Sequence, residues 1–127
     1  IVTREKLRIE FDEEKKSIRI TTPGQNQIEI NDDEKSIQLC DQHQNQLVMN
    51  SNGITISSAK DLILKSKGTI TLDSISNVNM KSHADVNIDG LNVNAKANVS
   101  FTAKGTASAE LSASGQTVVK GAMVMIN

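Results

Sequence analysis

The sequence predicts an all-β fold: an intertwined homotrimeric triple-stranded β-helix with octad repeats, shaped as a triangular prism needle. Three observations lead to it. Apolar residues recur in blocks of eight, no segment shows the three- and four-residue apolar spacing of an amphipathic helix, and Phe11 and Phe101 are the only aromatic residues. Because aromatic side chains usually supply much of a compact core, this chain must bury surface through repeated small and β-branched residues.

Residues 1–53 are predicted to form a collar or stalk of β-strands that leads from a missing upstream domain into the needle. Apolar residues at i and i+2 share one face of a strand, and such pairs recur here every nine or ten residues. The pairs are Ile9/Phe11, Ile18/Ile20, Ile28/Ile30, Ile37/Leu39 and Leu47/Met49. Polar, turn-forming segments separate them, at residues 12–16, 23–26, 31–34 and 50–53.

Residues 54–127 are predicted to form the needle and its C-terminal tip. Positions one and three of each octad are apolar, so we expect one short strand with two inward side chains, followed by a bend of small and polar residues. The octads assign these side chains to the trimer core: Ile54, Ile56, Leu62, Leu64, Ile70, Leu72, Val78, Met80, Val86 and Ile88.

The octad phase slips after Ile88, by the equivalent of three deleted residues. We expect an irregular corner near Gly90. Beyond it the apolar pairs are Leu91/Val93, Val99/Phe101 and Ala107/Ala109. Val99 and Phe101 are added to the predicted core, where the small alanine layer would compensate for three Phe rings. The register of the last layers is left unassigned.

Three chains are predicted because one chain would make a poor solenoid. A short single-chain β-helix leaves its sheet edges unpaired and buries little surface against its entropy cost. If three chains wind together, strands of the other two flank every strand. Three copies of each inward side chain then face one another, which suits Ile, Val, Leu and Met.

Charge and cysteine content argue against several classes of site. The net charge is -1, so we expect the chain to lack the strong basic patch that is typical of nucleic-acid binders. Cys40 is the single cysteine, and with His43 it forms the only Cys/His cluster, far in sequence from His83. Zinc needs further ligands, so we expect no catalytic, cofactor-binding or metal site. The roles of these three residues, and an ion or lipid on the trimer axis, are left open.

No segment approaches the ~18 apolar residues of a transmembrane helix, and we see no signal-peptide core at the N-terminus. Charge is sparse toward the C-terminus, where residues 101–127 carry only Lys104, Glu110 and Lys120. An exposed apolar end of this kind indicates a docking surface.

Four segments carry a resemblance to a known family. They are residues 22–28 (TPGQNQI), the octads from Ile54, residues 90–95 (GLNVNA) and the ending 114–127 (SGQTVVKGAMVMIN). Together they cover nearly the whole chain. In these segments the chain resembles the C-terminal region of the VgrG spike of type VI secretion systems and the spikes of contractile phage tails.

The resemblance implies a structural, membrane-puncturing spike that is not an enzyme. It implies a homotrimer that joins tube and hub proteins, carries a conical PAAR-repeat tip protein and meets the target envelope transiently. It also implies assembly in the bacterial cytoplasm followed by injection through that envelope. The predicted tip residues are Val118, Val119, Gly121, Ala122, Met123, Val124, Met125, Ile126 and Asn127. The resemblance leaves open whether the parent machine is a secretion system or a phage-like particle. It also leaves open the identity of the cap and of the effectors.

Other readings of the repeat are weaker. A β-helical carbohydrate lyase or hydrolase needs clustered carboxylates on one face, and here they lie mainly in turns. A calcium-binding β-roll needs a glycine-aspartate nonapeptide, which is absent. A trimeric fibre or adhesin that binds a cell surface remains the alternative, because the repeat alone does not distinguish it from a spike.

Overall fold

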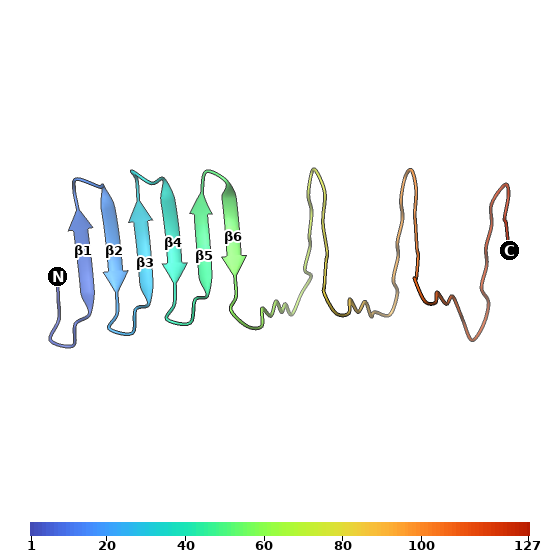
Figure 1. The fold of residues 1–127 in the computed structure, drawn as a ribbon, viewed down its shortest axis with the longest axis horizontal. Helices are drawn as coiled ribbons and strands as arrows, with labels where there is room; N and C mark the ends of the chain where they lie inside the picture. Colours follow the sequence, from blue (N-terminus) through green and yellow to red (C-terminus); the bar gives the residue numbers. More distant parts are fainter. The chain divides into compact units, whose positions relative to one another are not determined.

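A computed structural model describes residues 1–127, and every strand in it lies before residue 58 (Figure 1). There is no helix, and so none long and apolar enough to cross a membrane. The all-β prediction is confirmed. Contacts divide the chain into two units, residues 1–73 and 74–127. The strands are β1 (Arg8–Asp12), β2 (Ser17–Thr21), β3 (Gln27–Asn31), β4 (Ser36–Cys40), β5 (Gln46–Asn50) and β6 (Gly53–Ser57).

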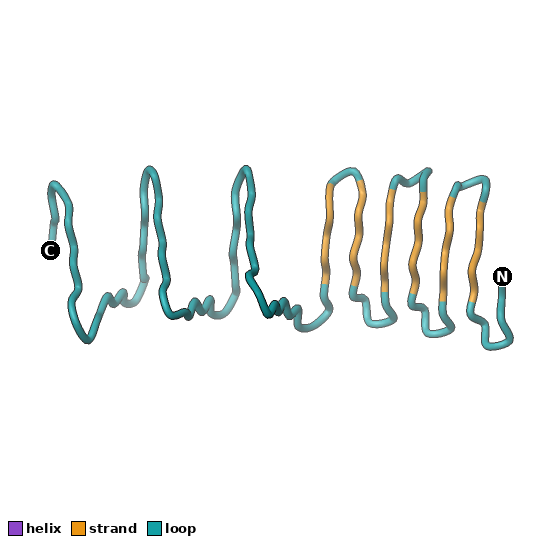
Figure 2. Tube along the Cα trace, turned by 180° about the vertical axis from the view of Figure 1, so that it is seen from behind, coloured by secondary structure: helices purple, strands orange, loops and turns teal.

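The six strands form one antiparallel sheet in which neighbours in the chain are neighbours in the sheet (Figures 1 and 2). Each apolar pair predicted in residues 1–53 lies on its own strand, from Ile9/Phe11 on β1 to Leu47/Met49 on β5. The strand prediction for this region is therefore confirmed. The first octad pair, Ile54/Ile56, lies on β6 of the same sheet. The domain boundary between residues 53 and 54 stays a prediction.

Five-residue turns lie at one end of the strands and repeat every nineteen residues. Thr3, Thr22 and Asp41 begin these turns. In each, a side-chain oxygen of the first residue accepts the amide N–H of the fifth, over 3.0, 3.2 and 2.8 Å in chain order. The fourth residue of each turn takes a positive φ of 61°, 67° or 70°. The same local chemistry therefore closes successive hairpins.

A second repeated turn lies at the opposite end of the strands. It begins at Asp12, Asn31 and Asn50. Their side-chain oxygens accept amides of the turn over 3.0, 3.0 and 2.9 Å, the pattern of Asx turns. The first two turns end in a lysine with positive φ, whereas the third is shorter and continues directly into Gly53 at φ 114°. Alternation between the two kinds of turn explains the nine- and ten-residue spacing of the apolar pairs.

Residues 58–127 contain no strand but bend at regular intervals. Bends fall at residues 59–60, 67–68, 75–76 and 83–84, the eight-residue spacing of the octads. A serine opens each one, and its hydroxyl accepts the amide two residues later over 3.1–3.4 Å. These serines are Ser58, Ser66, Ser74 and Ser82. The strands predicted for the octads after Ser57 are not seen, because none of these segments has a hydrogen-bonded partner within the chain.

Near Gly90 the bends indicate a smaller slip than the apolar pairs do. Beyond it the bends fall at residues 91, 98–99, 106–107, 114–115 and 122. The bend at 98–99 follows that at 83–84 by fifteen residues, so two octads have lost one residue rather than the three that apolar pairing indicated. Val99 stands at this bend and is 98% exposed, like the bend residues Ile75 and Leu91 at 110% and 101%. That position disfavours the inward side chain predicted for Val99.

Candidate trimer interface

One face of the sheet is apolar across all six strands. Side chains alternate between faces along each strand, and the register places the apolar residues directly opposite one another. They form two continuous rows, which we call the apolar face. The rows are Ile9, Ile20, Ile28, Leu39, Leu47, Ile56 and Phe11, Ile18, Ile30, Ile37, Met49, Ile54.

No part of residues 1–73, the unit that contains the sheet, covers this face. The chain has no buried hydrophobic side chain, and even the central Ile28 and Ile30 are 43% and 42% exposed. Antiparallel sheets are stable with one face in water when the other packs on a core. An exposed apolar area of this extent marks an interaction surface, since each Å² of it left in water costs about 25 cal/mol.

The opposite face is polar, and its charged groups are satisfied within the chain. Arg19 Nη2 on β2 donates to Glu29 Oε1 on β3 over 2.9 Å. Glu29 also accepts from Gln27 over 2.9 Å and from Asn31 over 3.4 Å, and it is only 8% exposed. The Arg19 hydrogen bond is the main reason that the pKa of Glu29 is lowered. The charged side chains at the centre of this face are therefore paired within the chain, while the buried Ser36 hydroxyl on the same face has no hydrogen-bond partner.

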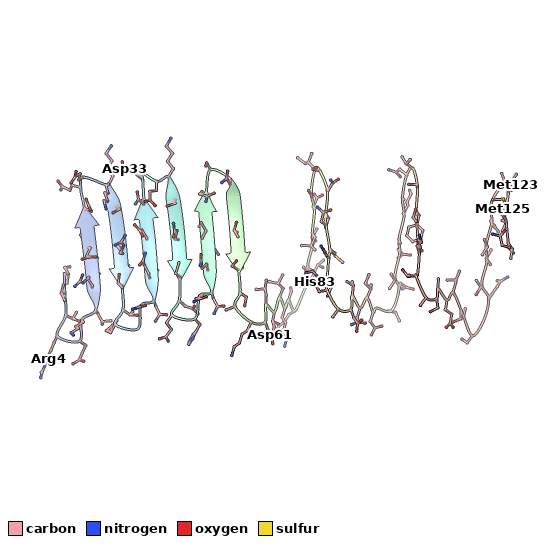
Figure 3. All side chains as sticks on the ribbon, viewed as in Figure 1. Arg4, Asp33, Asp61, His83, Met123 and Met125 are labelled. Atoms are coloured by element: carbon pink, nitrogen blue, oxygen red, sulfur yellow. The ribbon has the colours of Figure 1, made fainter.

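Charged groups also cluster where chain reversals occur. Arg4 lies at one end of the hairpins and Asp33 at the other (Figure 3). Asp41 organises its turn by accepting the amides of His43 and Asn45, both over 2.8 Å. The Asn45 side chain, which donates to Asp41 Oδ2 over 2.7 Å, is the main cause of the lowered pKa of Asp41. These carboxylates serve turn geometry.

The sequence-predicted core residues are exposed in the single chain. Ile54 and Ile56 extend the two rows of the apolar face onto β6. The later pairs, from Leu62/Leu64 to Val86/Ile88, are also exposed and lie in no strand. Their inward orientation stays a prediction, as does that of Phe101, which begins the extended segment after a bend.

Sequence reasoning did not assign the apolar pairs of β1 to β5 to the trimer core. The apolar spacing predicts that these pairs lie on one face of each strand. It does not give the register that aligns the pairs of neighbouring strands. The repeat of turn residues every nineteen positions carries that information. Thr3, Thr22 and Asp41 fix where each hairpin starts, and hence which apolar residues face one another.

The predicted tip residues, Val118 to Asn127, are all exposed. Met123 and Met125 lie close together near the chain end (Figure 3). Nothing in the chain covers them, and their docking role stays a prediction.

The residues whose roles were left open lie in three different parts of the chain. Cys40 is a half-buried free thiol at the end of β4, opposite Gln27 and Gln46 on the polar face. His43 lies in the turn begun by Asp41, and His83 lies at an octad bend (Figure 3). No three His, Cys, Asp or Glu side chains gather where they could hold a metal ion.

Comparison with known proteins gives one family. The model of the phage baseplate V C-terminal trimerisation domain matches residues 17–94. This range is more than half of the chain and runs from β2 through β6 into the octads. A search of curated proteins finds no match.

Proposed function

Because the chain belongs to the family of phage baseplate V C-terminal trimerisation domains, we propose that it is the rigid C-terminal part of a membrane-puncturing spike. The family is structural and defined by trimerisation, which supports self-association and a role in a tail or baseplate spike. The observation that carries the proposal is the uncovered apolar face. A chain with no buried hydrophobic side chain needs further copies to make its core.

In the proposed trimer, three sheets turn their apolar faces to a common axis. The polar faces, with Arg19 and Glu29, then point to solvent. Six strands at about 4.8 Å spacing give this part a length of roughly 24 Å along the axis. Three copies of each row residue would meet on the axis, which favours the Ile and Leu side chains that dominate both rows.

In the same trimer, the octads wind into a triple-stranded β-helix. The extended segments between bends have free backbone donors and acceptors, which strands of the other two copies would satisfy. The serine-opened bends would form the corners of a triangular prism. Their eight-residue spacing and the exposure of the apolar pairs, such as Ile70/Leu72, support this arrangement.

The proposed work is mechanical. As in VgrG spikes of type VI secretion systems, which the sequence resembles, sheath contraction would drive the spike through a target envelope. Continuous interchain hydrogen bonds and a dry interior resist buckling during that stroke. The spike would assemble in the bacterial cytoplasm with tube and hub proteins, and Val118 to Asn127 would receive a PAAR-repeat tip protein.

Sedimentation of the 127-residue chain tests the trimer. We expect the mass of three copies, and a folded, stable monomer would overturn the proposal. Binding of a PAAR-repeat protein to the full chain, and its loss in a chain ending at Gly115, tests the tip. A trimer that binds intact cells but no such protein would support the fibre or adhesin alternative.

A further inference from the structure

The two parts of the chain differ in where their backbone partners lie. Between Arg8 and Ser57 every strand pairs with its neighbour inside the chain. From Ser58 onward there is no strand, and apart from the contacts of Ser58 and Ala59 with Asn45 the hydrogen bonds are those of local bends. The backbone hydrogen bonds of the sheet can therefore all be made within one chain, whereas those of the octads need strands from elsewhere.

The sheet also presents its apolar face already organised. Local hydrogen bonds in the turns fix the hairpins. The turns are closed by Thr22 and Asp41 at one end of the strands and by Asn31 at the other. Local contacts form early because little loop entropy is lost. A preorganised face also loses less entropy on association than a disordered one.

Asn45 ties the first octad bend to the end of the sheet. Its Oδ1 accepts the Ala59 amide over 2.9 Å and the Ser58 hydroxyl over 3.4 Å, while its Nδ2 donates to Asp41. The equivalent Asn26 accepts the amide of Gln42, in the next turn, over 3.1 Å. The carboxamide thus sets the position from which the octads leave the sheet.

We propose that the sheet trimerises first and sets the register in which the octads of three chains then pair, from Ile54 toward the C-terminus. The inference rests on the proposed trimer. Once three sheets are joined, the octads of the three chains are held at a high effective concentration. With Asn45 holding Ser58 and Ala59 in each copy, corresponding octads start at the same height along the axis.

The order of dependence can be tested in the full chain by hydrogen exchange resolved by segment. Val86→Lys, in the octads, should leave a trimer with residues 8–57 protected while the octads lose protection. Leu39→Lys, on the apolar face, should lose the trimer and the protection of the octads together. Protected octads in Leu39→Lys, or an unprotected sheet in Val86→Lys, would overturn the inference. A monomeric wild type would instead overturn the trimer itself.

The role of Asn45 is tested by the rate at which octads gain protection during refolding. Asn45→Ala removes both acceptor contacts and the Nδ2 donor to Asp41. A typical hydrogen bond contributes about 1 kcal/mol, and if that much is lost at the step that sets the register, octad protection slows about fivefold. Protection of residues 8–40 should appear at the wild-type rate. Gln46→Ala, an exposed neighbour on the polar face, is the matched control. Equal octad rates in wild type and Asn45→Ala would contradict a register-setting role.

Discussion

Ile28 on β3 lies directly opposite Leu39 on β4, yet 43% of Ile28 and 42% of Leu39 stay exposed. Opposed side chains in an antiparallel pair touch laterally but leave the top of each side chain open. Because no side chain in either row of the apolar face is buried, the sheet cannot form a core alone. The missing cover must come from outside the sheet, and a trimerisation family indicates further copies.

Leu39→Lys should abolish the trimer. A lysine at this position would place three ammonium groups near one axis, and an unpaired buried charge costs several kcal/mol. Light scattering should show the mass of one chain at concentrations where the wild type is trimeric. Gln38→Lys is the control, because Gln38 lies on the polar face opposite Glu29; its mass should stay that of a trimer.

Glu29→Gln should lower stability by about 1 kcal/mol at neutral pH. The hydrogen bond to Arg19 holds the pKa of Glu29 below its ordinary value, but Arg19 is 44% exposed, so solvent weakens the pair. A carboxylate with a lowered folded pKa stabilises the protein above its unfolded pKa, and this is lost as pH falls through the folded pKa. Urea unfolding should therefore show the wild-type advantage shrinking in acid; an advantage that grows there would contradict this assignment.

The strands could be predicted from sequence more fully than the interface. Apolar residues at i and i+2, such as Ile18/Ile20, depend only on strand alternation, and each predicted pair lies on a strand. The apolar face depends on register, which turns begun by Thr22 and Asp41 determine through hydrogen bonds that apolar spacing does not reveal. The size of the slip near Gly90 differs between two signals: apolar pairs such as Leu91/Val93 indicate three residues, whereas the bends, one of which is at Leu91, indicate one.

Thr22→Val should destabilise the second hairpin by about 1 kcal/mol. The Thr22 hydroxyl accepts both the backbone and side-chain N–H groups of Asn26, over 3.2 and 3.1 Å. Valine keeps the shape but removes the acceptor, and a typical hydrogen bond contributes about 1 kcal/mol. Thermal unfolding measures the loss. Thr22→Ser retains the hydroxyl and should stay closer to the wild-type midpoint than Thr22→Val.

Gly53→Ala should destabilise the sheet, because Gly53 enters β6 at φ 114°. A side chain there would meet no atom within 4 Å, so the cost is backbone strain alone, about 1–3 kcal/mol. Gly68→Ala is the control, since that glycine lies outside the positive-φ region and its added Cβ would have only ordinary contact, at 3.8 Å, with Ser66. Urea unfolding should rank wild type and Gly68→Ala together, above Gly53→Ala.

Phe101→Asp should destabilise the trimer far more than Val99→Asp. The bends place Val99 at a corner, 98% exposed, and start the next extended segment near Phe101. Position one of an octad points to the trimer axis in the proposed needle, so an aspartate at 101 would bury three carboxylates, whereas one at 99 would meet solvent. Thermal unfolding of the two trimers measures the difference. A corner position and a core position should not lose the same stability when each receives an aspartate. Equal losses of stability in the two variants would therefore favour the three-residue slip, in which both side chains point inward.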